Sequence, residues 1–168
     1  MFAVRFIEQA DLPHVLAAER ALHTVRVSDP DFGRFNALNP WAVGREGLLR
    51  LVRQRKRGAE RETRALVAHE PGRDACGCFV YEKHADRLEV VWLSARPGRR
   101  FEPAVSAMLV WLKNKAAAKG RSVVYRLRDR DEAGIRVLLP LFRRHGFSVR
   151  LEPDAFGHCD GWLCTFSR

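Results

Sequence analysis

The chain of 168 residues, 46% hydrophobic and 30% charged, has the length and balance of one globular domain over residues 1–168. Its 10 Phe and 4 Trp exclude disorder as the main state, and its longest apolar run, Ala104 to Leu112, is about half the length of a membrane span. Lys and Arg number 30 against 20 Asp and Glu, and the net charge of +10 indicates either polyanionic partners, such as nucleic acid or a phosphorylated cofactor, or a surface charged for solubility.

The first element in chain order is a short strand, because Phe2, Val4 and Phe6 alternate with residues for the opposite face. Asp11 then serves as a candidate cap of a helix that has Pro13 in its first turn. The same segment carries charges where a secretion signal has an uncharged apolar core, so we expect a cytoplasmic protein with no membrane association.

The middle of the chain predicts a loop, a helix and three strands. Residues 28–40 are rich in turn formers, and helical spacing returns from Trp41 to Arg57. The segments Arg64–His69, Cys76–Lys83 and Leu88–Ala95 follow in close succession, separated by short turns. Such spacing is typical of an antiparallel meander.

The second half alternates helices with strands. We expect helices at Pro103–Lys119 and Asp131–His145, and strands at Ser122–Leu127, Phe147–Leu151 and Trp162–Phe166. The complete order is β-α-α-β-β-β-α-β-α-β-β, an α/β (α+β) mixed sheet with helices on both faces. Pairing should be antiparallel in the first half and locally parallel in the centre, with right-handed crossovers.

The four cysteines are expected to be reduced thiols. Cys76 and Cys78 would point to one face of a regular strand, and either His69 or His158 could join them at a zinc ion. No second CxxC pair and no HxxxH spacing supports such a site. We therefore expect no metal, and we interpret the two cysteines as small strand residues.

Element order, element lengths and two local motifs resemble the GNAT superfamily of acyl-CoA-dependent N-acyltransferases over essentially the whole chain. The first motif is a strand that ends in Ala95-Arg-Pro97 and leads through an arginine-rich turn into a helix. The second is Arg143-Arg-His-Gly-Phe147 at the end of the next helix. The resemblance implies transfer of an acetyl group from acetyl-CoA to a primary amine of an unknown acceptor.

A helix start has unpaired N–H groups and the positive end of the helix dipole, and both favour a pyrophosphate. The family's turn reads Arg/Gln-x-x-Gly-x-Gly/Ala. Here Arg100 matches the Arg, but Pro103 and Val105 take the small-residue places and Glu102 adds a negative charge. The resemblance implies that the CoA phosphates bind at this turn and that the thioester lies along the preceding strand. The cofactor-binding residues expected on this basis are Leu93, Ser94, Ala95, Arg99, Arg100, Phe101, Ala104 and Val105.

Amide formation requires a base for the amine and stabilisation of the departing thiolate. The resemblance implies Glu89 as the base; the alternative is a structural ion pair with Arg87 or Lys83. The family's usual acid is a Tyr, at a position that Phe142 occupies here. Tyr125 on the preceding strand is the replacement that the chain offers, unless it is an aromatic residue packed under a helix.

These departures leave a second hypothesis open, namely a catalytically inactive GNAT-like domain that binds nucleic acid or a protein partner. They also leave two arrangements of the turn. Arg100 contacts the pyrophosphate in one, and Glu102 pairs with Arg99 and closes the turn in the other. We expect a monomer or a homodimer, with the acceptor pocket built from the loops Thr24–Asn39 and Glu152–Gly161.

Overall fold

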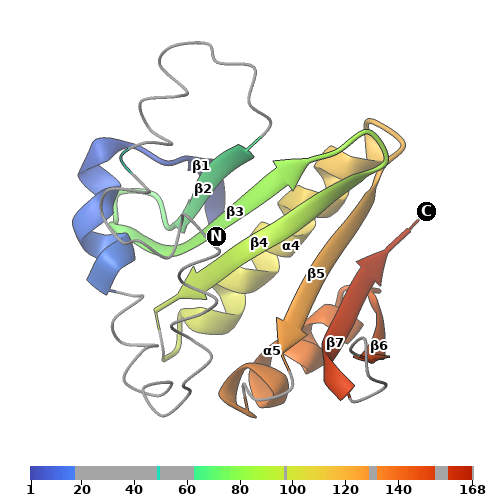
Figure 1. Ribbon diagram of the computed structural model, residues 1–168. Coiled ribbons are helices and arrows are strands. Elements are labelled where there is room, and N and C mark those ends of the chain that lie inside the picture. The colour runs from blue at the N-terminus through green and yellow to red at the C-terminus, as the bar shows by residue number, and fades with distance from the viewer. Residues whose placement is uncertain (18–48, 50–62, 97, 129–131, 154–158, 168) are drawn as a thin grey trace.

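A computed structural model describes residues 1–17, 49, 63–96, 98–128, 132–153 and 159–167 (Figure 1). Its elements are β1 (Ala3–Phe6), the 3-10 turn η1 (Gln9–Asp11) followed by helical residues 12–17, β2 (Thr63–His69), β3 (Ala75–Lys83), β4 (Arg87–Ala95), α4 (Phe101–Ala117), β5 (Ser122–Arg128), α5 (Glu132–Arg144), β6 (Ser148–Pro153) and β7 (Cys159–Phe166). The expected element order is confirmed for these residues. The loop expected at 28–40 and nearly all of the helix expected at Trp41–Arg57 lie outside them.

The strands form one sheet of 7 strands in the order β1-β2-β3-β4-β5-β7-β6 (Figure 1). The antiparallel meander of β2, β3 and β4 is confirmed, and so is the parallel centre, where β4 pairs with β5. A second parallel pair, between β5 and the strand after α5, does not form. β7 instead lies between β5 and β6 and pairs with both in antiparallel ladders.

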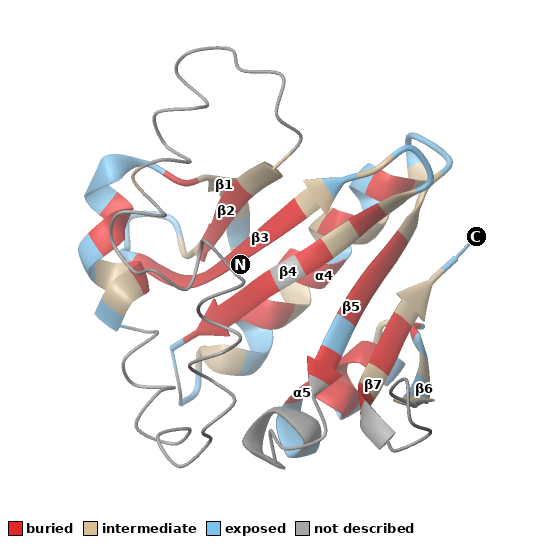
Figure 2. Cartoon of the chain, viewed as in Figure 1, coloured by how far each residue is buried: buried red, intermediate tan, exposed pale blue. Residues whose placement is uncertain are grey.

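The sheet separates two hydrophobic cores, because successive strand residues point to opposite faces. The core under α4 includes Leu66, Phe79, Leu93, Met108, Leu112 and Phe142. The core on the other face includes Leu12, Val15, Val67, Val80 and Trp92, so the first helix packs on that side. Figure 2 shows the buried positions along the central strands and along α4. Helices on both faces, as the sequence predicts, are confirmed.

Both long helices end at glycines. Gly120 follows α4 with φ of +62° and Gly146 follows α5 with φ of +79°, a region of backbone space that favours glycine. Pro140 lies inside α5, which continues to Arg144. Among the described residues, no helix combines the length and the hydropathy that crossing a membrane requires.

Asp11 has a different role from the one expected. It lies at the end of η1, where its carboxylate accepts a hydrogen bond of 2.8 Å from the Glu8 N–H and forms an ion pair of 2.7 Å with Arg5. The capping box therefore stabilises the 3-10 turn that precedes the helix, not the first turn of the helix itself. The hydrogen bond to Asp11 raises the pKa of Arg5.

Two β-bulges break the regular alternation of side chains. In β3 the register passes from Gly77 to Ala75, so Cys76 is an extra residue. In β4 the register passes from Trp92 to Val90, and Val91 is extra. The expectation that Cys76 and Cys78 share a face is wrong, because the first bulge turns them into opposite cores.

Candidate functional site

The centre of the sheet opens along β4. Arg87–Val90 pair with Ser122–Tyr125 of β5, and no register continues beyond them in the described residues, although β4 extends to Ala95. Figure 1 shows the two strands side by side at their start and diverging toward their ends. From Trp92 to Ala95, β4 keeps its antiparallel partner β3 on one edge only. Backbone N–H and C=O groups on its other edge need different partners, which an extended ligand with amide groups could supply.

This open half of β4 leads directly into the turn before α4. Gly98 has a φ of +105°, which a glycine tolerates, and its carbonyl accepts a hydrogen bond of 3.0 Å from the Phe101 N–H. The Arg96 N–H donates to the Cys76 carbonyl at 2.6 Å, which anchors the turn to β3. Burial raises the pKa of the Cys76 thiol, and the positive charge of Arg100 partly offsets this rise. The turn is therefore fixed at both ends.

The start of α4 has fewer free N–H groups than a regular helix start. Pro103 has none, and the Ala104 N–H donates to the Arg100 carbonyl at 3.0 Å. The side chains of Ala104 and Val105 are fully buried against the sheet. No backbone carbonyl of the described residues accepts a bond from the Glu102 N–H, so this group, together with the arginine side chains, is available to an anion.

Ion pairs flank the turn. Arg100 Nη2 lies 2.7 Å from Glu70 Oε2; the contact is an ion pair without an aligned hydrogen bond. Glu102 pairs with Arg144 at the end of α5. The alternative arrangement, in which Glu102 pairs with Arg99, is not the one observed, because Arg144 at the end of α5 supplies the cation. Arg99 itself is exposed.

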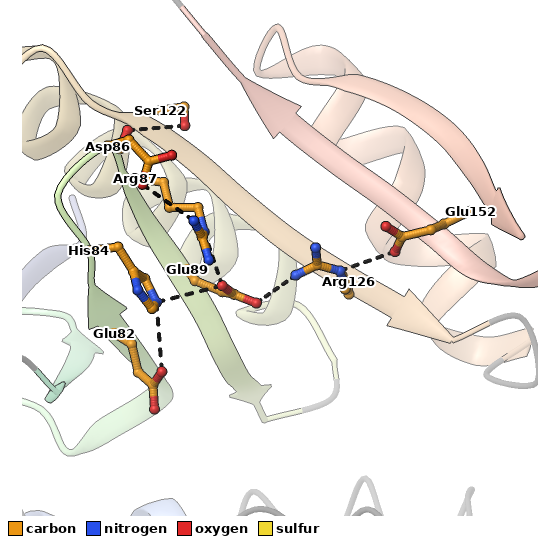
Figure 3. A network of polar contacts seen from close by, with 8 residues as sticks. All are labelled: Glu82, His84, Asp86, Arg87, Glu89, Ser122, Arg126 and Glu152. Atoms are coloured by element: carbon orange, nitrogen blue, oxygen red, sulfur yellow. Dashed lines mark hydrogen bonds and ion pairs between the residues drawn. The ribbon is translucent and has the colours of Figure 1, made fainter. Parts of the chain in front are cut away.

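Glu89 is the centre of a polar network on the face opposite α4 (Figure 3). Its side chain is 21% exposed, with Oε1 2.6 Å from Arg126 Nη1 and Oε2 3.1 Å from Arg87 Nε. Arg126 also contacts Glu152 of β6 at 3.1 Å. The pairing of Glu89 with Arg87, one of the two partners considered from the sequence, is present. Arg126 is the first residue of β5 beyond its last pair with β4, so it bridges the two strands where they begin to part.

Sequence reasoning did not find His84, Arg126 or Glu152 as members of this network. His84 Nε2 lies 3.6 Å from Glu89 Oε2 and 3.7 Å from Glu82 Oε2 (Figure 3). The sequence carries one usable signal for His84, which is its place beside the turn that joins β3 and β4. Arg126 and Glu152 come from strands whose order in the sheet no local pattern determines.

Tyr125 lies on the face of the sheet opposite Glu89. It pairs with Val90, and both side chains belong to the core under α4. Its ring stacks on Phe142 with centroids 5.2 Å apart and an interplanar angle of 7°. Glu89 points the other way, so the structure does not bring Glu89 and Tyr125 together on one side of the sheet.

The expected cofactor-binding residues form one continuous stretch from the open half of β4 through the turn into α4. Leu93 and Ala95 point into the core under α4, and Ser94 points to the opposite face. Thr24–Asn39 lies outside the described residues, and Glu152–Gly161 lies only partly within them. In the described part of the chain, no three His, Cys, Asp or Glu side chains gather where a metal ion could bind.

No family model matches the sequence, and no curated protein matches it. Solved structures do match. The paiA N-acetyltransferase of Thermoplasma acidophilum in complex with coenzyme A has a TM-score of 0.73 at 13% identity, over 100% of this chain and 99% of that one. An aminoglycoside 6'-acetyltransferase type Ii has a TM-score of 0.63 at 12% identity, over 98% and 96%. A GNAT-family protein of Desulfovibrio desulfuricans has a TM-score of 0.64 at 15% identity, over 99% of each chain. The GNAT fold expected from the sequence is confirmed.

Proposed function

We propose that the protein transfers an acetyl group from acetyl-CoA to a primary amine. One observation carries the proposal: the half of β4 that has lost its partner on one edge continues without interruption into an arginine-bearing turn and the start of α4. An extended thioester arm requires unpaired backbone groups along its length, and a pyrophosphate requires N–H groups and cations at its end. The fold shared with a CoA-bound N-acetyltransferase supports the same assignment.

Arg99 and Arg100 are the proposed phosphate ligands. Arg100 already holds a carboxylate, that of Glu70, at 2.7 Å. A phosphate oxygen would replace this internal anion, since a guanidinium binds carboxylate and phosphate in similar geometry. Leu93, Ser94 and Ala95 would offer backbone groups to the extended arm. The start of α4, at the phosphate end of the site, would be held against the sheet by Phe101, Ala104 and Val105.

Glu89 is the proposed base. The amine nitrogen attacks the thioester carbonyl carbon, the C–S bond breaks, CoA departs as a thiolate, and the proton lost by the amine passes to the Glu89 carboxylate. Arg87 and Arg126 orient this carboxylate at 3.1 Å and 2.6 Å. Its position where β4 and β5 begin to part supports the role, because an amine would meet it beside the open half of β4.

Tyr125 is the proposed acid for the departing thiolate. Its ring comes from the face under α4, whereas Glu89 comes from the opposite face. A thioester lying in the plane of the sheet would have the base on one side and the acid on the other. A Tyr125→Phe variant keeps the stacking on Phe142 and removes only the hydroxyl. A lower kcat with unchanged affinity for acetyl-CoA supports the role, and an unchanged kcat contradicts it.

Two measurements test the proposed function. Calorimetry with acetyl-CoA should give saturable binding, and an assay for free CoA thiol should report turnover with a panel of primary amines: an aminoglycoside, a diamine and a peptide with a free N-terminus. Absence of both heat and thermal shift at millimolar acetyl-CoA would contradict the proposal.

Nucleic-acid contact through the basic surface and the oligomeric state stay predictions from the sequence. A titration with tRNA at rising salt tests the first, because each phosphate contact adds to the salt dependence of binding. Sedimentation analysis separates a monomer from a homodimer.

A further inference from the structure

The Ser94 side chain in β4 is buried and has no hydrogen-bond partner among the residues that the structure describes. The residue is 2% exposed, and no described group lies within hydrogen-bonding range and geometry of its Oγ. A buried hydroxyl without a partner destabilises a fold, and nearly all buried polar groups in proteins are paired. An unpaired hydroxyl in the open half of β4 therefore requires an explanation.

The β4 bulge decides which way Ser94 points. Because Val91 is an extra residue, Trp92 and Ser94 face the core opposite α4, whereas Leu93 and Ala95 face α4. Glu89 also points away from α4, since it lies between two residues of the core under α4. The bulge therefore places Ser94 and the proposed base on the same face of the strand.

The acceptor amine must lie on this face, because the proposed base projects from it. An extended cosubstrate that uses the open backbone edge of β4 lies in the plane of the sheet, because the N–H and C=O groups of a strand point within that plane. Side chains project above and below it. The face below the plane is covered by α4, and a core that includes Leu12 and Val15 covers part of the face above it. Ser94 projects above the plane, on the same side of the cosubstrate as Glu89.

We propose that the Ser94 hydroxyl binds the acceptor, accepting a hydrogen bond from the N–H of the primary amine and so directing the nitrogen lone pair at the thioester carbonyl. This inference rests on the proposed acetyl transfer and adds a contact to the acceptor half of the reaction. Ser94 then has two separate roles, with its backbone beside the cosubstrate and its side chain on the acceptor. The apolar surroundings of the hydroxyl strengthen a single hydrogen bond to an amine.

The experiment uses the full chain and the amine of the panel that wild-type protein acetylates fastest. In Ser94→Ala, we expect KM for that amine to rise about 3- to 10-fold, the effect of one neutral hydrogen bond. The Kd of acetyl-CoA should stay at the wild-type value. The Tm should stay equal or rise, because the variant removes a buried group that has no partner in the free protein.

Two further variants separate binding from structure. Ser94→Thr keeps the hydroxyl and should restore KM toward wild type, with circular dichroism as a check of the fold. Cys78→Ala changes the cross-strand neighbour of Ser94 on the same face, and it should lower Tm without changing KM.

Three results would overturn the inference. A fall in Tm of Ser94→Ala with unchanged KM would show that the hydroxyl stabilises the fold. A weaker Kd for acetyl-CoA with unchanged KM for the amine would assign it to the cosubstrate. Absence of both heat and thermal shift when wild-type protein is mixed with acetyl-CoA would overturn the proposed function, and the acceptor role with it; that result is distinguishable because it appears before any substitution is made.

Discussion

The two faces of the central strands differ in what they hold. Under α4, side chains from β4, β5 and β7 pack with Phe142 and Phe147 into an apolar core. On the opposite face the same strands carry Glu89 with its two guanidinium partners and the Ser94 hydroxyl, which has no partner among the described residues. One face supplies most of the packing that stabilises the fold, and the other keeps polar groups that packing alone does not require. Substitutions on the two faces should therefore affect different measurements.

Phe142→Ala should have the largest effect, and it should act on stability. Phe142 is 0% exposed, stacks on Tyr125 and meets the edge of Phe147 at 4.9 Å between centroids. Its loss should lower the free energy of unfolding by about 3–5 kcal/mol, measured by urea denaturation. Val137→Ala on the same helix, at a residue 44% exposed, is the control and should cost less than about 0.5 kcal/mol. Equal costs would contradict the stabilising role of this face.

Glu89→Gln should act on turnover. Without a base, kcat should fall about 100-fold or more, while the Kd of acetyl-CoA stays unchanged. Glu152→Gln is the matched control, because Glu152 also pairs with Arg126 but comes from β6. Stopped-flow or steady-state assays for free CoA would measure both. If the two variants lost kcat equally, the ion-pair network would be the requirement, and Glu89 would not be the base.

Arg100→Ala should weaken binding of acetyl-CoA by about 10- to 100-fold in calorimetry, because it removes charge-assisted bonds to phosphate. Glu70→Gln should have the opposite sign, with affinity up to about 5-fold higher, since the competing internal anion at 2.7 Å is gone. Arg73→Ala removes the other cation near Glu70, at 3.7 Å, and should leave affinity unchanged. Unchanged affinity in Arg100→Ala would mean that the turn does not bind phosphate.

Cys164 should make the core under α4 sensitive to high pH. Burial raises the pKa of its thiol from 9.0 to about 12 in the folded protein. The thiol therefore loses its proton at a higher pH in the folded state than in the unfolded state. Its contribution to the free energy of unfolding is fully present below pH 9 and is lost as the pH rises toward 12. Between pH 8 and pH 10, the free energy of unfolding of the wild-type protein should fall by about 1.4 kcal/mol more than that of Cys164→Ala. Parallel stability curves of the two proteins would contradict this expectation.

Much of the fold could be predicted from local sequence, because each element has its own signal. Alternation predicted β2 to β5 to within a residue or two at each end, and Gly120 and Gly146 ended the long helices with positive φ. The position of β7 between β5 and β6 could not be predicted, because a strand's partners depend on the whole sheet. Cys76 shows the limit of alternation, since one bulged residue reversed the relation between two cysteines.

The candidate site was predicted only in part, and for a similar reason. The turn before α4 follows its strand directly in the chain, so Arg100 and Glu102 were identified from the sequence. Their partners are Glu70, in the turn between β2 and β3, and Arg144, at the end of α5. No pattern in the sequence predicts either ion pair. Glu89 was proposed from the family resemblance, whereas no sequence signal pointed to Arg126, which contacts it from 37 residues away. Contacts between residues of different strands can be identified only once the fold is known.

Val91 illustrates how little chain is needed to reassign a strand. If the bulge were straightened with Val91 retained, strict alternation would rotate the rest of β4 by half a turn about its axis. Trp92 would then have to fit beneath α4, and Leu93 and Ala95 would face the opposite side of the sheet. Deleting Val91 would instead remove the bulge and leave these three side chains on their present faces. One extra residue thus exchanges the inner and outer surfaces of half a strand without altering a single side chain. The spacing between Glu89 and the end of β4 carries as much information as the residues themselves.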